Sequence, residues 1–165
     1  MIAFSLRRLA PIAGLTIAVA TAAFAQRPDA AMIKDEIFAR KILMDTVDAN
    51  MDEIDWMVVS GKPIDLAEAG EHADTISVML MALPHLFPPD TNQWQPGAKR
   101  DPGRDTYASP ALWENFQDFY RQAEKVSQMA YAASRARSEA EFRNIFASLR
   151  AACETCHAQY VKTDR

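Results

Sequence analysis

Cysteine, histidine and glycine are scarce in this chain of 165 residues, which contains two, three and five of them. Two cysteines cannot build the dense disulfide framework that holds many small secreted domains together. Beyond the N-terminal segment there is no apolar run of the roughly 20 residues that a membrane-spanning helix needs. An excess of basic residues is also missing, because 18 Lys and Arg face 22 Asp and Glu. Nucleic-acid binding by a basic surface, which depends on neutralising phosphates, is therefore excluded.

The first 25 residues differ in character from the rest of the chain. A basic pair, Arg7-Arg8, precedes an apolar stretch from Leu9 to Ala22 and the small residues Ala23-Phe24-Ala25. This order is typical of a secretory signal peptide that is cleaved after its last small residue, an uncleaved anchor being the alternative. We expect export to a bacterial periplasm. Residues 26–165 would then form one domain, with a formal charge of −6 in place of −4 because the basic pair is lost.

Apolar residues recur at spacings of three and four in four segments, the pattern of amphipathic helices that pack together. The first segment runs from about Asp29 to Val59, the second follows Asp65, the third follows Ser109 and the fourth follows Ser138. No segment alternates with the period of two that strands require. The pattern predicts an all-α fold, an antiparallel four-helix bundle with a long loop between helices 2 and 3.

Local signals mark where these helices begin and end. Gly61 suits the end of the first helix, since glycine readily adopts the conformation found just past a helix terminus. Ser109-Pro110 is typical of an N-cap followed by the first helical residue. Ser138 and Glu141 have the spacing of a capping box at the start of the last helix.

Both cysteines lie in the segment Cys153-Glu154-Thr155-Cys156-His157, which has the C-x-x-C-H spacing of c-type haem attachment. Residues i, i+3 and i+4 project from one side of a helix, so these two thiols and the imidazole can face one object. Cys153 and Cys156 would form thioether bonds to the haem, and His157 would bind its iron. Covalent attachment would keep the cofactor in place after export. The motif therefore predicts one haem c.

Three other interpretations of the two cysteines stay open at this point. A redox-active dithiol of the thioredoxin type would be expected beside a βαβ unit, which the pattern does not contain. A closed zinc site would need a fourth ligand, from a carboxylate or from His72 or His85. A structural disulfide across so short a loop would constrain little of the unfolded chain.

With its haem motif in the last turns of the last helix, the chain resembles the class II c-type cytochromes, the cytochrome c-prime family, from Asp29 to Lys162. Further matches are Arg40 one turn before Met44, and the stretches Gly61–Asp65, Leu83–Pro88 and Ser109–Trp113. The resemblance implies an antiparallel four-helix bundle around the haem. It also implies electron exchange with a redox partner protein rather than enzymatic catalysis, and many relatives form homodimers.

The resemblance leaves the sixth iron position to be assigned. Some members of the family have an open distal face, and low-spin members place a methionine there. Matching Arg40 to the arginine common in the first helix of the family puts Met44 at the distal position. Met51 lies on the same helix face and is the alternative ligand, and an open site is the third interpretation. A His157/Met44 pair predicts low-spin electron transfer, whereas an open site predicts binding of nitric oxide or carbon monoxide.

Arg40 is a charged residue on an otherwise apolar helix face and therefore calls for a partner. The family suggests a haem propionate; the alternative is a long side chain that reaches solvent. We expect His72 and His85 to be surface or packed histidines without a role at the iron. No Ser-His-Asp, paired-carboxylate or phosphate-loop arrangement is present, so the sequence does not predict an enzyme.

Overall fold

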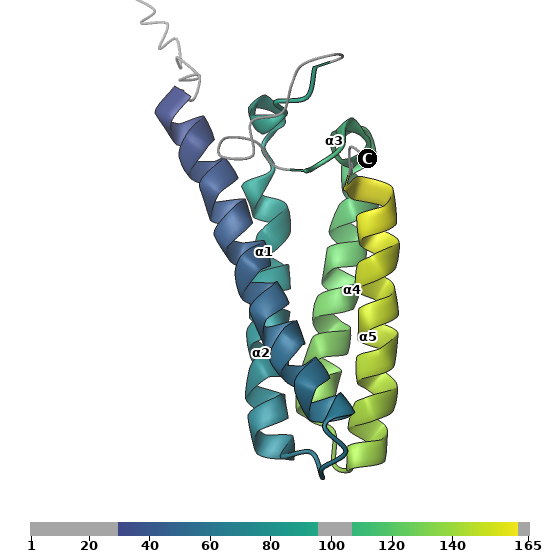
Figure 1. The fold of residues 1–165 in the computed structure, drawn as a ribbon. Coiled ribbons are helices and arrows are strands. Elements are labelled where there is room, and N and C mark those ends of the chain that lie inside the picture. The colour runs from purple at the N-terminus through teal and green to yellow at the C-terminus, as the bar shows by residue number, and fades with distance from the viewer. Residues whose placement is uncertain (1–29, 96–106, 162–165) are drawn as a thin grey trace, which may run out of the picture.

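The computed structural model describes residues 30–95 and 107–161. In these ranges the four long helices lie side by side and run alternately in opposite directions along one axis (Figure 1). The predicted all-α antiparallel four-helix bundle is thereby confirmed. The predicted signal peptide, residues 1–25, and part of the predicted long loop, residues 96–106, lie outside the described residues. The elements are α1 (Ala30–Val59), α2 (Leu66–Ala82), the 3₁₀-helices η1 (Leu83–Leu86) and η2 (Pro89–Thr91), α3 (Pro110–Glu114), α4 (Phe116–Ser134) and α5 (Glu139–Tyr160).

Side-chain caps fix two of the helix starts. The carboxylate of Asp65 accepts hydrogen bonds from the backbone N–H groups of Ala67 and Glu68, at 2.9 and 3.3 Å, and so starts α2. At the start of α5, Ser138 Oγ accepts from the Glu141 N–H at 3.2 Å, as the capping box predicts. In a capping box the glutamate side chain accepts from the N–H of the N-cap residue. Here Glu141 Oε2 accepts instead from the N–H of Arg137, one residue before Ser138.

The third predicted helix is interrupted, which the apolar pattern did not reveal. α3 ends at Glu114 and α4 begins at Phe116, and Asn115 between them has non-helical dihedral angles of −121° and 37°. The Asn115 side chain donates to the carbonyl of Ala111 at 3.1 Å, a local bond that competes with helix continuation. Ser109 occupies the N-cap position of α3 as predicted, but its hydroxyl makes no capping hydrogen bond.

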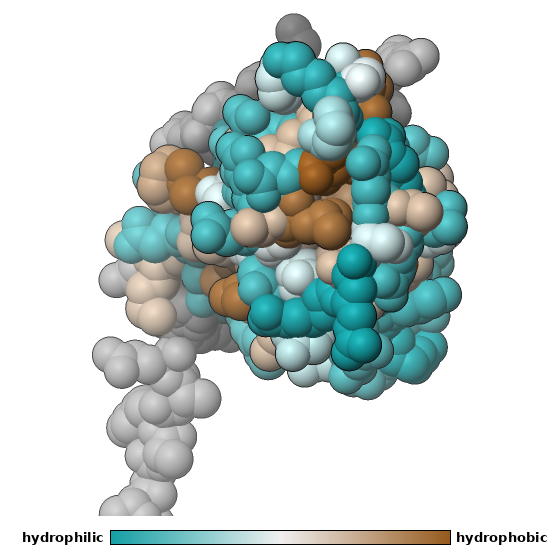
Figure 2. Space-filling view, turned by 90° about the horizontal axis from the view of Figure 1, so that it is seen from below, coloured by the Kyte–Doolittle hydropathy of each residue, from teal (hydrophilic) through white to brown (hydrophobic). Residues whose placement is uncertain are grey.

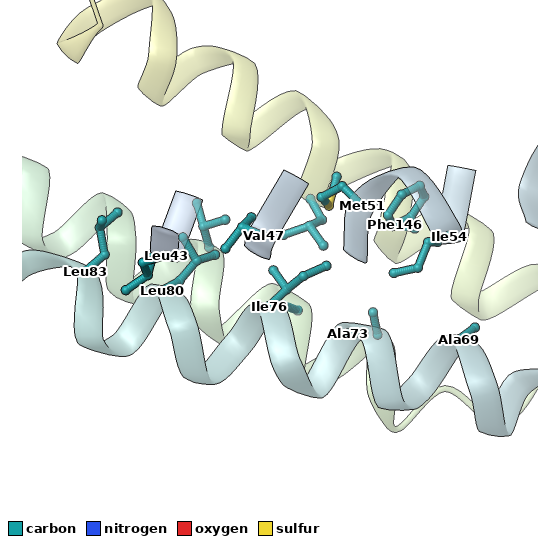
Figure 3. Close-up of a cluster of buried hydrophobic side chains, with 14 of the residues drawn as sticks. Leu43, Val47, Met51, Ile54, Ala69, Ala73, Ile76, Leu80, Leu83 and Phe146 are labelled. Atoms are coloured by element: carbon teal, nitrogen blue, oxygen red, sulfur yellow. The ribbon is translucent and has the colours of Figure 1, made fainter. Parts of the chain in front are cut away.

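The core lies between all four long helices, and its buried apolar residues form one continuous cluster. Between Leu43 and Ile54, apolar side chains of α1 lie over α2 (Figure 3). Met57 is also buried, although the three-four repeat of Val47, Met51 and Ile54 would continue at Val58. An α-helix drifts by about 20° per heptad against a three-four repeat, which shifts the buried face toward the end of a helix of 30 residues. The contacting residues that Figure 3 labels are Leu43, Val47 and Ile54 from α1, and Ala69, Ala73, Ile76 and Leu80 from α2.

The two halves of the bundle differ, and this difference positions the site. At the end where α1 stops and α2 starts, hydrophilic residues surround a small hydrophobic group (Figure 2). Behind that end the interior is filled by Ile54, Met57, Phe142 and Phe146. Toward the opposite end α1 leans away from α5 (Figure 1), and there the interior contains a cavity. No helix in the described ranges is long and apolar enough to cross a membrane.

Candidate functional site

The C-x-x-C-H motif lies on the last two turns of α5, beside the cavity. Cys153 and Cys156 are half-buried and His157 is exposed, and all three line the cavity, whose volume is about 530 Å³. This volume is within the range of about 300–1,000 Å³ that is usual for sites of small molecules and cofactors. The helical spacing thus brings two thiols and an imidazole to one cavity.

The walls of the cavity come from every long helix of the bundle and are largely apolar. Such walls suit a flat, apolar macrocycle better than a polar substrate, because few hydrogen-bonding groups are offered. The apolar wall residues are Met44, Val47 and Met51 of α1, Leu80 and Leu83 of the α2–η1 segment, Phe87, Leu112 of α3, and Phe119, Ala123 and Val126 of α4.

Both thiols are poor nucleophiles in this environment. Burial raises the pKa of Cys156 to about 11, with a further contribution from the neighbouring Cys153. Burial also raises the pKa of Cys153. Reactive dithiols of oxidoreductases instead have a lowered pKa, since the thiolate is the attacking form. The surroundings of these cysteines therefore do not favour the thioredoxin-type interpretation.

Arg40 is buried at the cavity wall and lacks part of its hydrogen bonding. Its side chain is 1% exposed, so it does not reach solvent. The guanidinium lies over the ring of Phe87 at 4.3 Å and near that of Trp113 at 5.8 Å, and Nη2 donates to the Thr91 carbonyl at 3.4 Å. Nε and Nη1 have no partner among the described residues. Two unused donors on a buried cation are a ready site for an anionic group.

The charge of Arg40 persists at neutral pH. Burial lowers its pKa to about 10, and the nearby carboxylate of Glu36 opposes this change. A pKa of about 10 still leaves the guanidinium protonated. An unpaired buried charge is costly, so a bound anion would stabilise this arrangement.

Both candidate methionine ligands line the cavity. Met51 is buried at 7% exposure within the hydrophobic cluster, whereas Met44 is half-buried and packs against that cluster from the cavity side. Met32, by contrast, is exposed, and Met57 lies in the filled half of the core. Of the four methionines of α1, only Met44 and Met51 therefore line the cavity that His157 also lines.

The remaining histidines lie away from the cavity. His72 Nδ1 is 2.8 Å from Asn50 Oδ1, which links α2 to α1 on the bundle surface. His85 is exposed, and its ring meets that of Tyr120 edge-on at 5.9 Å. Within the described ranges, no three His, Cys, Asp or Glu side chains are arranged to hold a metal ion as a group.

Carboxylates predominate where the cavity opens between α1 and α5. Asp48 and Glu154 lie close enough to Cys153 to add to the rise in its pKa that burial causes. Arg150 also lines the opening, but its guanidinium is engaged in an ion pair with Asp55 of α1. Acidic side chains therefore outnumber basic ones in this part of the lining. The charged lining residues are Lys41, Asp45, Asp48, Asp52, Arg150 and Glu154.

Some of the residues around the site gave no signal in the sequence. Phe87 and Thr91 hold the Arg40 guanidinium, yet they are about 50 residues away along the chain. Asp118 of α4 accepts a hydrogen bond from Tyr160 at 2.6 Å, across 42 residues. Such pairings follow from tertiary packing, and no local motif marks them.

The residues present fit a c-type haem. Two thiols at the attachment spacing, an adjacent imidazole, an apolar cavity and a buried cation with unused donors all meet in one place. Cys153 and Cys156 could hold the group covalently, His157 could ligate its iron, and Arg40 could pair with an acidic substituent.

Comparison with known proteins gives consistent matches over most of the chain. The family model described as Cytochrome C' matches residues 35–161. Cytochrome c-554 of Cereibacter sphaeroides is 31% identical over 161 residues, which are 93% of this chain and 97% of that protein. Cytochrome c-556 of Agrobacterium fabrum is 29% identical over 127 residues, which are 76% of this chain and 80% of that protein. The solved structure of cytochrome c′ from Rhodopseudomonas palustris has a TM-score of 0.69 at 23% identity, covering 79% of this chain and 98% of that one.

Proposed function

Because the chain belongs to the cytochrome c′ family, a family of haem proteins rather than enzymes, we propose that it is a periplasmic electron carrier with one covalently bound haem c. The observation that carries this proposal is the joint lining of one apolar cavity by Cys153, Cys156 and His157. When bound, the haem supplies an iron that gains and loses one electron. The export signal predicted for residues 1–25 supports the periplasmic location.

In this function the protein would bind the haem and control the surroundings of its iron. Cys153 and Cys156 would anchor the haem, and His157 would provide the proximal nitrogen ligand. The Arg40 guanidinium, held by Phe87 and the Thr91 carbonyl, would pair with a propionate through its two unused donors. The apolar walls would keep water from the iron, which limits the solvent reorganisation that accompanies a change of charge.

We assign the sixth ligand to Met44, and the register of α1 against α5 supports this choice. Arg143 Nη1 of α5 donates to the Val58 carbonyl of α1 at 2.8 Å. Ten residues farther along α5 lies Cys153, and ten residues back along α1 lies Asp48, whose carboxylate acts on that thiol in addition to burial. The hydrogen bond of Arg143 and the effect of the Asp48 charge on Cys153 fit one antiparallel register.

In this register His157, four residues beyond Cys153, lies level with Met44, four residues before Asp48. Met51 lies level with Arg150, about 10 Å farther down the bundle at 1.5 Å per residue. The ion pair of Arg150 with Asp55 spans one turn more, a reach that its long side chain allows. Methionine ligation raises the reduction potential of a haem, which suits a carrier of electrons.

Two kinds of protein partner belong to this proposal. A redox partner would exchange electrons at the opening between α1 and α5, beside Cys153 and His157, which would hold the haem. A second copy of the chain would form a homodimer through the exposed apolar side chains of Phe38, Ile42 and Val78 on α1 and α2. Light scattering of the purified protein would then give the mass of two chains.

The alternative function is that of a gas-binding protein with five-coordinate, high-spin iron. It would apply if Met44 only packs beside the cavity, leaving the distal side of the iron open to nitric oxide or carbon monoxide. The half-buried position of Met44 at the cavity wall suits a shielding role as well as ligation. The two functions make different predictions for variants of this residue.

Haem extraction tests the anchoring directly. The pyridine haemochrome of the purified protein should report a c-type haem, and acid–acetone should leave the haem with the protein, because thioether bonds survive this treatment. Extraction of the haem into the organic phase would show that Cys153 and Cys156 are not its anchors.

The role of Arg40 predicts a large effect on stability. Arg40→Met should lower the free energy of unfolding of the haem-loaded protein by about 3 kcal/mol, because an anionic group is left buried without its partner. Arg150→Met is the matched control at the cavity opening and should change stability by about 1 kcal/mol or less. Denaturant unfolding measures both. Equal, small effects would show that Arg40 has no anionic partner.

A further inference from the structure

Hydrogen bonds to one carboxylate of α4 hold the end of α5 that carries the haem motif. Asp118 of α4 lies opposite the last turn of α5, and its Oδ2 accepts a 2.6 Å hydrogen bond from the Tyr160 hydroxyl. Gln122 donates to the same oxygen at 2.7 Å, and Gln159 does so at 3.4 Å. Gln122 also donates to the Gln159 side chain at 2.8 Å, which closes a network between the two helices.

The segment before α3 makes further contacts with the same turn of α5. The Ser109 N–H donates to the Tyr160 carbonyl at 2.8 Å, and Ala108 forms an isolated antiparallel bridge with Val161. The Tyr160 ring is 2% exposed, lines the cavity and packs edge-on against Phe119 at 5.5 Å. Tyr160 follows His157 by three residues, so whatever holds Tyr160 also holds the turn from which the imidazole projects.

Asp118 also carries a negative charge one side chain away from the cavity, because Tyr160, whose hydroxyl donates to it, lines that cavity. The hydrogen bond from Tyr160 is the main cause that lowers the pKa of Asp118, so the group is ionised at neutral pH. On its outer side, Asp118 pairs with Arg121, which is 66% exposed. Water therefore screens part of the charge but not all of it.

We propose that Asp118 is a positioning residue that holds the iron-binding turn of α5 through Tyr160 and lowers the reduction potential of the haem through its charge. This inference rests on the proposed haem-binding function. A negative charge near the iron favours the ferric form, which carries one more positive charge than the ferrous form. The hydrogen bond and the charge act separately, so two substitutions can separate them.

The test uses the haem-loaded wild-type protein and the variants Asp118→Asn and Tyr160→Phe. Hydrogen exchange of peptides covering residues 157–161 should become about tenfold faster in both variants, since each weakens the connection to α4. Only Asp118→Asn should also raise the potential, with the equilibrium constant for reduction increasing about threefold, as expected for a partly screened charge. Tyr160→Phe keeps the charge and should leave the potential nearly unchanged.

Arg121→Gln is the matched control, because it removes the exposed partner of Asp118 without touching Tyr160. It should leave the exchange rates unchanged and shift the potential, if at all, in the direction opposite to Asp118→Asn. Unchanged exchange in both Asp118→Asn and Tyr160→Phe would overturn the positioning role, and an unchanged potential in Asp118→Asn would overturn the electrostatic one. Failure of the haem-binding function itself would be visible already in the wild-type protein, as a lack of bound haem or of reversible one-electron reduction.

Discussion

Removal of both thiols, by Cys153→Ala together with Cys156→Ala, should abolish covalent haem attachment and leave little folded protein when the chain is exported. Without the haem the bundle would be left with a cavity of about 530 Å³ that is open to solvent and has largely apolar walls. These walls would lose the burial that the haem provides, at roughly 25 cal/mol per Å² of apolar surface. Because the whole stability of a typical domain is only about 5–15 kcal/mol, the apoprotein should be marginally stable at best.

Yield from an export host, circular dichroism and haem staining of denaturing gels measure this outcome together. The single variant Cys153→Ala is the graded control, because Cys156 can still form one thioether bond and some holoprotein should remain. A double variant that is fully helical, stable and produced at the wild-type yield would mean that the haem is not needed to complete the core.

Met44→Leu should keep the fold and change the ligation and spin state of the haem iron. Leucine has nearly the volume of methionine, so the substitution should lower stability by less than about 1.5 kcal/mol. If Met44 is the sixth ligand, the variant becomes predominantly high-spin, its reduction potential falls, and its ferrous form binds carbon monoxide readily. Visible spectra, redox titration and carbon monoxide binding each report one of these changes.

Met51→Leu is the matched control for this substitution, since both methionines line the cavity from the same helix. It should leave the spectrum unchanged. The opposite result, a high-spin Met51→Leu variant beside a normal Met44→Leu variant, would assign the ligand to Met51. A wild-type protein that is already high-spin and binds carbon monoxide rapidly would exclude both methionines and favour the gas-binding function.

Much of the bundle is predictable from the sequence because its determinants are local. The cap at Asp65 and the start of α5 at Ser138 depend on residues two or three positions away. The interruption at Asn115 was not predictable in this way, because the apolar repeat continues across it. The repeat reports which side faces the core, and it is insensitive to one residue whose side chain bonds to the preceding turn.

In the site, too, some features depend on neighbouring residues and others on residues far apart in the chain. The spacing of Cys153, Cys156 and His157 specifies their common side of a helix without any reference to the rest of the fold. Choosing between Met44 and Met51 requires the register of α1 against α5. That register depends on contacts between residues 85 and 95 positions apart in the chain, those of Arg143 with Val58 and of Arg150 with Asp55. No periodicity within α1 contains that information.

For Arg40, some properties could be predicted from the sequence and others could not. Its place on an apolar face indicated a charge in need of a partner. The aromatic surface of Phe87 and Trp113 that holds the guanidinium, and the two donor atoms left unused, follow only from the tertiary packing around Arg40.

The visible spectrum of the purified ferric protein tests the central claim most directly. A haem c ligated by His157 and Met44 predicts a Soret band, a low-spin spectrum and the weak methionine-to-iron charge-transfer band at the red end of the visible range. A high-spin spectrum without that band would contradict methionine ligation and the electron-carrier function built on it. The lack of any Soret band would contradict haem binding itself.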